Sequence, residues 1–254
     1  MKNKKNRTVI YQFRRDLRLS DNPEFAAACT YENIIPVYIL NEKGLGGASR
    51  WWLRRSLISL QETLRKKGSE LYIVDEKDAG NLKELKNQLP AELVTGAGAS
   101  LLSQPDEVLK SDKTPYLVYT AYWNAFKKAV KVRAIIGEPK IPPLPKVNLK
   151  TVTLEPLKVS WDKGLQSSWQ PGELQANKCL KDFLEKRLAE YEEQRNYPAI
   201  VGTSRLSPYL HFGEISPQQI WHGLNLKENE QFAKELVWRE FSYYLLHFYP
   251  HIVN

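Results

Sequence analysis

The chain has 254 residues, of which 42% are hydrophobic and 26% are charged, and these values exclude a disordered or collagen-like chain. The net charge of +8 arises in residues 1–175, because residues 176–254 hold 9 Lys and Arg against 10 Asp and Glu. This basic excess fits a solvated surface as well as a patch that attracts phosphate groups. The sequence contains no signal peptide, no apolar stretch long enough to span a membrane, and no metal-binding spacing of Cys or His. We therefore expect a soluble, cytoplasmic protein without a membrane span or a metal site.

The first half of the chain predicts alternating strands and helices. Runs of β-branched, aromatic or other apolar residues predict strands at Thr8–Phe13, Ile34–Leu40, Leu71–Asp75 and Glu92–Thr95. Amphipathic or alanine-rich stretches between and after these strands predict helices at Glu24–Cys29, Ala48–Lys67 and Ala79–Leu89. Strands and helices alternating at this spacing predict an α/β domain with a doubly wound, Rossmann-like parallel sheet.

The second half predicts a linker followed by helices. The proline-rich stretch Gly137–Trp169 predicts an extended linker that runs over a surface. Beyond it, apolar residues at helical spacing predict one long helix that reaches Tyr191, and the Ser-x-x-Gln capping box of Ser216–Gln219 predicts the start of another. A last helix is expected from near Glu230, with Phe241 and Tyr244 on its apolar face. We therefore divide the chain into an α/β domain (residues 1–133), a linker (134–170) and an incomplete all-α domain (171–254).

Three glycine-rich or hydroxyl-rich turns are candidate phosphate sites. Gly44–Gly47 and Gly96–Ser100 are weak matches to a dinucleotide loop and are better explained as flexible loops, and no P-loop lysine follows either of them. Gly202–Pro208 combines three hydroxyl groups and Arg205 with the start of a helix, which suits a bound phosphate. The same turn is also explained by a helix that Ser207 caps, with Pro208 at its first position.

The stretch Lys234–Phe248 places an acid among aromatic residues. Glu240 and Tyr244 are four residues apart on one helical face, next to Trp238, so the carboxylate could hydrogen-bond a flat heterocycle that packs on a ring. An Arg239–Glu240 pair that closes a core helix explains the same residues. The spacing alone does not decide between the two interpretations.

Five blocks of the sequence resemble the DNA photolyase and cryptochrome family. They occur in the family's order over nearly the whole chain, at Phe13–Pro23, Trp169–Ala176, Tyr191–Pro198, Gly202–Ser207 and Leu236–Phe241. The resemblance implies an α/β antenna domain, a long linker and a helical domain that binds FAD. It also implies a deoxyribodipyrimidine photo-lyase activity, in which light drives an electron from reduced FAD to a cyclobutane pyrimidine dimer in damaged DNA.

The resemblance also implies roles for individual residues. Those that match the family's FAD contacts are Tyr191, Thr203, Ser204, Arg205, Leu206, Ser207 and Trp238. Those that match its DNA-facing positions are Arg195 and the run Glu240, Phe241, Ser242, Tyr243, Tyr244, Leu245, Leu246 and His247. Within that run, Glu240 is expected to be the catalytic acid that hydrogen-bonds the flipped dimer.

The sequence departs from the family at two places. The stretch after Val94 is short, so the α/β domain is expected to lack one element, which counts against a folate or deazaflavin antenna pigment. The chain ends at Asn254, within the helical domain, so we expect only the N-terminal part of the FAD pocket. Three hypotheses remain: a photolyase present as an incomplete chain, a non-catalytic relative with a binding or signalling role, and a nucleotide-binding α/β protein outside the family.

Overall fold

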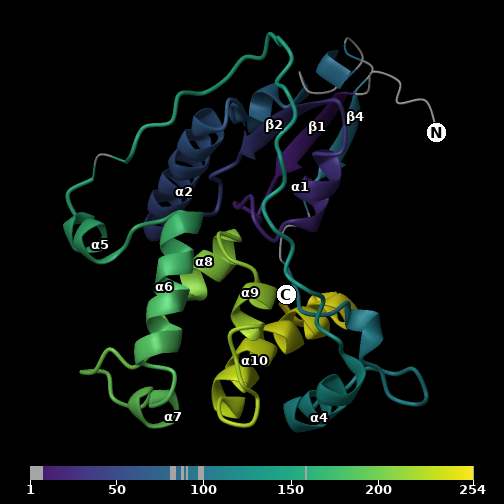
Figure 1. Ribbon diagram of the computed structural model, residues 1–254, viewed down its shortest axis with the longest axis vertical. Helices are drawn as coiled ribbons and strands as arrows, with labels where there is room; N and C mark the ends of the chain where they lie inside the picture. Colours follow the sequence, from purple (N-terminus) through teal and green to yellow (C-terminus); the bar gives the residue numbers. More distant parts are fainter. Residues whose placement is uncertain are drawn as a thin grey trace. The chain divides into compact units, whose positions relative to one another are not determined.

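The computed structural model describes residues 8–80, 84–86, 89, 91–96, 100–157 and 159–253, and these form two compact units (Figure 1). The α/β unit consists of Met1–Ser100, Ile136–Lys178 and Leu206–Ile215. The helical unit consists of Leu101–Ile135, Cys179–Arg205 and Ser216–Asn254. Each unit is therefore assembled from segments that are distant in the sequence.

The α/β unit contains a four-stranded parallel sheet in the order β3-β2-β1-β4. Its strands are β1 (Thr8–Phe13), β2 (Asn33–Leu40), β3 (Tyr72–Asp75) and β4 (Glu92–Thr95). Val9 of β1 pairs with Ile34 of β2 on one side and with Glu92 of β4 on the other. The chain therefore moves outward from β1 to β3 and then returns to the other side of β1, which confirms the predicted doubly wound sheet.

Both faces of this sheet are covered, as continuous apolar strands require. On one face, the rings of Tyr11 and Phe13 pack against Phe25 of α1, with ring centroids 5.2 and 5.3 Å apart. On the other face, alternate strand residues form a cluster with Leu85 and with Val147 and Leu149 of the linker. The strand residues in this cluster are Ile10, Ile35, Val37 and Val74.

The described helices agree with the sequence at most positions. They are α1 (Pro23–Ala28), α2 (Gly47–Lys66), α4 (Tyr119–Ala129), α5 (Lys163–Ser168), α6 (Glu173–Lys186), α7 (Tyr191–Gln194), α8 (Ser207–Phe212), α9 (Pro217–Trp221) and α10 (Glu230–Phe248), with single 3₁₀ turns at Glu76–Asp78, Pro105–Glu107 and Pro250–Val253. The capping box of Ser216 and Gln219 is present at the start of α9, as predicted. The helix predicted at Ala79–Leu89 and the loop predicted at Gly96–Ser100 lie partly outside the described residues.

The single long helix predicted as far as Tyr191 is wrong, because the chain breaks it into α6 and α7. The N–H groups of Arg187 and Leu188 both donate to the Phe183 carbonyl oxygen, and this widened last turn ends α6. The following turn brings the Tyr191 ring edge-on to the Phe183 ring, with centroids 5.7 Å apart. A continuous helix would not allow the same edge-to-face contact.

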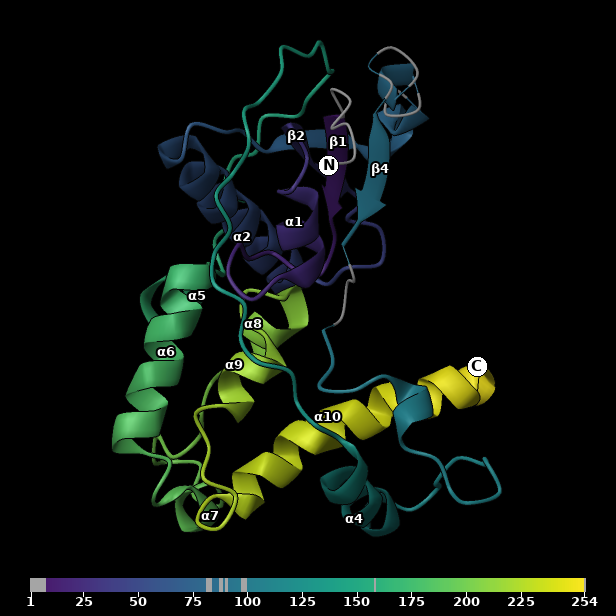
Figure 2. The same ribbon diagram turned by 45° about the vertical axis from the view of Figure 1, so that its right-hand side comes forward.

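The compact units differ from the predicted domain boundaries at residues 133 and 170. Residues 101–135 belong to the helical unit, where α4 lies beside α10 (Figure 2). The Tyr122 ring lies 5.0 Å from that of Phe241 and 4.7 Å from that of Tyr244. Conversely, the predicted linker packs with the α/β unit, where the Val152 N–H donates to the carbonyl oxygen of Ile73 in β3 at 2.7 Å.

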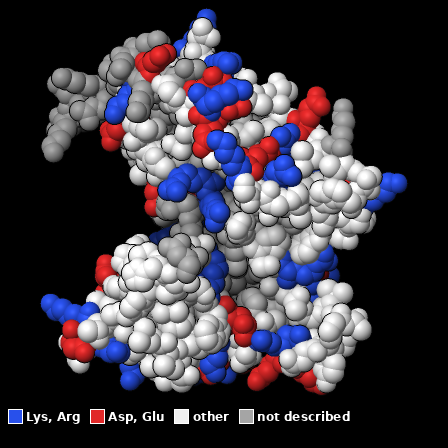
Figure 3. Space-filling view, turned by 180° about the vertical axis from the view of Figure 1, so that it is seen from behind, with Lys and Arg blue, Asp and Glu red and all other residues white. Residues whose placement is uncertain are grey.

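Several basic side chains of the α/β unit are paired with acidic ones. On the face shown in Figure 3, Lys and Arg side chains of this unit are interspersed with Asp and Glu side chains. The recorded ion pairs are Lys43–Glu76, Arg54–Glu42, Arg65–Glu70, Lys67–Glu138, Lys77–Asp75 and Lys150–Asp78. At these positions of the described chain, the pairs agree with a solvated surface. None of the helices in the described ranges combines the length and the hydropathy needed to cross a membrane.

Candidate functional site

The segment from residue 203 to residue 207 comes after α7 in the chain. It is preceded by Gly202, whose backbone lies close to that of Gln194 at the end of α7. A Cβ atom at Gly202 would lie 2.7 Å from the carbonyl oxygen of Gln194, so only glycine fits there. Arg205 has φ of 56°, in the left-handed region, which turns the chain sharply before α8. Thr203 and Ser207 are exposed, Ser204 and Arg205 are half-buried, and Leu206 is buried. The segment thus presents hydroxyl groups at the surface of a constrained turn.

Within the helical unit, Cys179 of α6 and Arg187, the residue after that helix, hold residues 203–205 of this segment. The Cys179 thiol donates to the carbonyl oxygen of Ser204, and the Arg187 Nη1 donates to that of Thr203, both at 3.3 Å. The Arg187 guanidinium pairs with Asp182, at 2.7 Å between Nη2 and Oδ2, while its Nε is buried and has no hydrogen-bond partner among the described residues. The Nε is thus a donor left without an acceptor beside the turn whose carbonyl oxygen Arg187 holds.

The predicted cap at Ser207 is not present. Helix α8 begins at Ser207 itself, with Leu206 as the N-cap residue and no side-chain hydrogen bond to the first turn. Ser207 therefore has helical backbone angles, which place its hydroxyl too far along the turn to act as the cap. The capped-helix explanation of the Gly202–Pro208 turn loses its main support.

Tyr191 and Arg195 lie together at the start of α7 and just after it. Tyr191 is 8% exposed, and its ring meets the rings of Phe183 and Phe232 edge-on. The Arg195 guanidinium lies 5.4 Å from the Tyr191 ring centroid, and its Nη1 is 2.5 Å from Oε1 of Glu235 in α10. Hydrogen bonding to Glu235 raises the pKa of Arg195. This predicted DNA contact is therefore a surface cation with an acidic partner.

Trp238 is an exposed aromatic surface on α10. Its indole is 44% exposed and stacks on the ring of Tyr119 in α4, with centroids 3.7 Å apart and an interplanar angle of 11°. The Tyr119 hydroxyl donates to the carbonyl oxygen of Lys234 at 2.6 Å, which fixes this ring against α10. One face of a rigid aromatic pair is thus available for packing.

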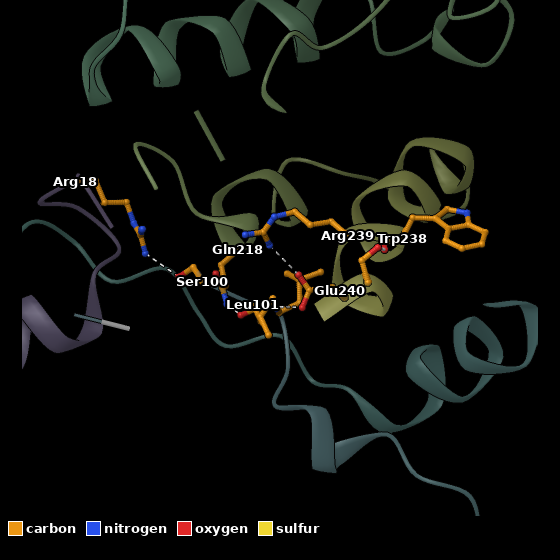
Figure 4. Close-up of polar contacts among 9 residues, drawn as sticks. Arg18, Ser100, Leu101, Gln218, Trp238, Arg239 and Glu240 are labelled. Atoms are coloured by element: carbon orange, nitrogen blue, oxygen red, sulfur yellow. Dashed lines mark hydrogen bonds and ion pairs between the residues drawn. The ribbon is translucent and has the colours of Figure 1, made fainter. Parts of the chain in front are cut away.

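Glu240 points away from Trp238 and into the protein (Figure 4). It is 2% exposed, and its Oε2 accepts the backbone N–H of Leu102 at 2.7 Å while Arg239 lies 3.3 Å from Oε1. The neighbouring residue Leu101 is held by Gln218, whose Nε2 donates to its carbonyl oxygen at 2.5 Å. Burial raises the pKa of the Glu240 carboxyl to about 7, although Arg239 and nearby backbone N–H groups act in the opposite direction.

The predicted DNA-facing run does not form one surface. Glu240, Phe241 and Tyr244 are buried, and the Tyr244 hydroxyl donates to the carbonyl oxygen of Val108. Three other residues of the run are exposed, namely Ser242, Leu246 and His247. The remaining two, Tyr243 and Leu245, are half-buried. The sequence analysis missed Glu235, although it lies only three residues before Trp238 on the same helix, a spacing that predicts a shared face.

The α/β unit contains a separate aromatic pocket of about 500 Å³. It is lined by the first turns of α2, by α5 and Trp169, and by α8; the residues are Ala48, Ser49, Trp51, Trp52, Leu165, Trp169, Ser207, Pro208, His211 and Phe212. The indole N–H of Trp51 donates to Asp162, and that of Trp52 to Glu214, so both rings are fixed. Its size and aromatic walls suit a flat molecule, and the sequence analysis did not find it.

The end of α8 is fastened to this unit by a buried carboxylate and a glycine. Glu214 is fully buried and accepts hydrogen bonds from Trp52 Nε1 at 2.8 Å, Ser56 Oγ at 2.6 Å and the Gly172 N–H at 2.5 Å. Burial raises the pKa of its carboxyl to about 7, although these hydrogen bonds lower it. Gly213 has φ of 72°, and a Cβ atom there would lie 2.1 Å from the carbonyl oxygen of Arg15.

The sheet's switch point, between the carboxyl ends of β1 and β4, is filled by a side chain. Ligands of doubly wound sheets bind at this position. Here a Cβ atom on Gly96 would lie 2.1 Å from the Oδ2 of Asp16, and the same oxygen accepts the Tyr11 hydroxyl at 2.7 Å. The Arg14 N–H donates to Oδ1 of Asp16 at 2.6 Å. This arrangement disfavours the hypothesis of a nucleotide bound at the edge of the sheet.

Comparison with known proteins identifies relatives over nearly the whole chain. The sequence profile described as DNA photolyase matches residues 9–99. The deoxyribodipyrimidine photo-lyase of Agrobacterium fabrum is 36% identical over 291 aligned positions, which cover 98% of this chain and 61% of the relative. Cryptochrome-2 of Arabidopsis thaliana is 30% identical over 278 positions, which cover 89% of this chain and 44% of the relative. The chain thus spans about three-fifths or less of the length of these relatives.

Solved structures of photolyases and cryptochromes are also similar to this chain. A bacterial class III photolyase from Agrobacterium tumefaciens superimposes with a TM-score of 0.87 at 33% identity, over 97% of this chain and 60% of that one. A cryptochrome from Synechocystis superimposes with a TM-score of 0.80 at 22% identity, over 97% of this chain and 62% of that one, and shows the shared fold alone.

Proposed function

Because the chain belongs to the DNA photolyase and cryptochrome family, we propose that it supplies the N-terminal part of a light-driven enzyme that splits cyclobutane pyrimidine dimers in DNA. The observation that carries this proposal is the turn at residues 203–207. It combines exposed hydroxyl groups with Arg205 and with the buried Arg187 nitrogen that lacks an acceptor. These groups are suited to the phosphates of FAD, whose flavin supplies the photochemical electron transfer when bound.

The chain's own residues would bind and orient rather than transfer electrons. Thr203, Ser204 and Arg205 of the helical unit would hold the phosphates. The stacked rings of Tyr119 and Trp238 would provide one wall for a flat group and exclude water from it. The residues present fit the phosphate end of the cofactor and one wall of its site, which agrees with a chain that covers 61% of its photolyase relative.

Loss of the Arg205 cation is expected to weaken flavin retention. In the purified chain mixed with excess FAD and then desalted, Arg205→Ala should reduce the affinity for FAD at least tenfold, because about 1.5–3 kcal/mol of charge-assisted hydrogen bonding is lost. The amount of retained flavin, measured by absorption and fluorescence, reports the affinity for FAD. Arg65→Ala is the matched control, since Arg65 is a surface arginine of the α/β unit that pairs with Glu70. Equal retention in Arg205→Ala would refute the phosphate role, and a wild-type chain that retains no flavin would refute FAD binding by this part.

The acid that faces the lesion is better assigned to Glu235 than to Glu240. The Glu235 side chain is 34% exposed, on the same helix as the exposed Trp238, whereas the Glu240 side chain is 1% exposed and accepts the Leu102 N–H. For Glu240 to contact a base, residues 101–103 would have to leave α10. We propose that Glu240 positions this segment and that Glu235 accepts hydrogen bonds from the flipped pyrimidine.

The two acids are distinguished by their variants. In Glu235→Gln, the preference for dimer-containing over undamaged oligonucleotide should fall about tenfold, because a charged acceptor becomes a neutral amide. In Glu240→Gln, the preference should persist while the thermal midpoint of unfolding changes. Fluorescence anisotropy and circular dichroism measure the two effects. The reverse pattern, with the preference lost only in Glu240→Gln, would return the catalytic role to Glu240.

A further inference from the structure

Strand β4 lies at one edge of the parallel sheet, next to β1 (Figure 2). Five of the six β1 residues are buried, whereas three of the four β4 residues are exposed, including Leu93 at 41%. Leu93 pairs with Ile10 and Val94 with Tyr11, and both of these β1 residues are fully buried. Because neighbouring residues of a strand point to opposite faces, the buried core of the sheet ends at β4 on both faces.

The outer side of β4 presents main-chain groups with which a further strand can pair. The Gly96 N–H donates to the carbonyl oxygen of Gln12 in β1 at 2.8 Å. Because main-chain groups alternate between the two sides of a strand, the N–H and C=O groups of Leu93 and Thr95 point away from β1. Among the residues that the structure describes, none is hydrogen-bonded to these outward groups.

The β4 edge lacks the features that keep natural edge strands from pairing, which are lysine, proline and bulges. Its sequence Glu-Leu-Val-Thr contains neither lysine nor proline, and its pairing with β1 is continuous from Glu92 to Thr95. Its one charged side chain is bonded within the same unit, where the Glu92 Oε2 accepts the Tyr31 hydroxyl at 2.6 Å. At the opposite edge, by contrast, the linker donates the Val152 N–H to the carbonyl oxygen of Ile73 in β3.

An internal shortening of the chain accompanies this open edge. The alignment with the Agrobacterium fabrum photo-lyase spans 291 positions, whereas this chain has 254 residues, so at least 37 residues of the relative have no counterpart within the aligned part. The sequence places a missing element directly after Val94, the third residue of β4. A strand from outside the chain therefore suits this edge.

We propose that two copies of this chain associate through their β4 strands, which pair antiparallel about a two-fold axis at Val94. In this register Leu93 of each copy lies opposite Thr95 of the other, and the two residues exchange their outward N–H and C=O groups. The two Val94 side chains lie directly opposite each other, and such β-branched pairs stabilise a sheet.

Charge and length also fit this arrangement. Glu92 of each copy faces Gly96 of the other, whereas a two-fold axis at Glu92 would place two carboxylates opposite each other. The two strands are identical in length, so each covers the exposed Leu93 of the other. The interface is small, and we therefore expect a dimer that dissociates on dilution. The proposal concerns the α/β unit and does not require that the chain bind FAD or DNA.

A cysteine cross-link tests the register. Opposite residues of a non-hydrogen-bonded antiparallel pair have Cα atoms about 4.5 Å apart, which permits a disulfide. Under mild oxidation, Val94→Cys should therefore give a covalent dimer on non-reducing electrophoresis. Glu92→Cys is the matched control, because its cysteine lies on the same strand but faces Gly96 of the other copy. Both variants retain Cys29 and Cys179, so these residues do not account for a difference.

Sedimentation velocity over a range of concentrations measures the association itself. The wild-type chain should change from monomer to dimer as its concentration rises. Thr95→Pro should raise the dissociation constant at least tenfold, because each copy loses an outward N–H donor at a position where an edge strand tolerates proline. Thr95→Val is the matched control, since valine keeps this N–H and suits a strand. Circular dichroism compares the folds of the variants.

Each outcome decides the proposal. A wild-type dimer that Thr95→Pro weakens and Thr95→Val leaves intact, together with cross-linking of Val94→Cys alone, supports it. A wild-type chain that stays monomeric up to the limit of its solubility overturns it. A dimer that Thr95→Pro leaves unchanged, or cysteine variants that cross-link equally or not at all, also overturns it. If Thr95→Pro unfolds, the comparison of Val94→Cys with Glu92→Cys decides by itself, and a failure to bind FAD leaves all of these readouts intact.

Discussion

Glu214→Ala is expected to lower the free energy of unfolding by about 3 kcal/mol or more, because three buried donors lose their acceptor and each such loss costs at least about 1 kcal/mol. Those donors are the Trp52 indole, the Ser56 hydroxyl and the Gly172 N–H, which come from α2 and from the turn before α6. For a chain of this size, the thermal midpoint should fall by roughly 10 °C. Glu193→Ala, which removes an exposed carboxylate, should leave the midpoint unchanged. A decrease of similar size in both variants would contradict the role given to the buried network.

The same carboxyl should make stability depend on pH. The folded chain retains a proton on Glu214 up to a pKa of about 7, whereas the unfolded chain releases it near the ordinary value of 4.5. The contribution of Glu214 to stability is therefore largest below pH 4.5, falls as the pH rises through 7, and then levels off. The contribution of one such group is at most about 3 kcal/mol. Glu240 shifts in the same direction, so Glu214→Gln should remove about half of the decrease measured by denaturant titration between pH 5 and 8.

Gly213→Ala is expected to cost roughly 3–5 kcal/mol of stability. The added Cβ would lie 2.1 Å from the carbonyl oxygen of Arg15 and 2.5 Å from the Cα of Asp16, and these backbone atoms cannot move independently. The left-handed φ of 72° adds conformational strain for any residue with a Cβ. Urea unfolding of the variant measures the total of both effects.

Gly68→Ala separates the two contributions. Gly68 has nearly the same backbone angle, with φ of 76°, but a Cβ atom there meets nothing within 4 Å. Its substitution should therefore cost only about 1 kcal/mol, the conformational part alone. If the two alanine variants were equally destabilised, the close approach of Gly213 to the backbone of Arg15 would have no energetic role.

The strands were predictable because each is a short run of β-branched or aromatic residues that both faces of a parallel sheet can bury. Helix α4 was not predicted, because its residues include several aromatic side chains with low helix propensity. Its stability comes from contacts with α10, such as the 4.7 Å ring contact between Tyr122 and Tyr244, which are distant in the sequence. The division into two units depends on these long-range contacts, so local sequence patterns could not predict it either.

The residues of the candidate site were identifiable from sequence, but their surroundings were not. The hydroxyl-rich turn at 203–207 and the exposed Trp238 are visible in the pattern of residue types. The burial of Glu240 depends on Leu102, 138 residues earlier, and the support of Thr203 depends on Arg187. Spacing on one helix could have identified Glu235 as a neighbour of Trp238, but not its pairing with Arg195.

The proline-rich linker also covers part of one edge of the sheet. Through the Val152 N–H it occupies the outer side of β3, whereas β4 is an edge strand among the described residues and its Leu93 is 41% exposed. An uncovered strand edge is a template on which another chain can add. The linker therefore covers part of the β3 edge, because the Val152 N–H takes the carbonyl oxygen of Ile73 that another strand would need. Proteolytic removal of the segment around Val152 is expected to leave this oxygen open to strand addition by another chain.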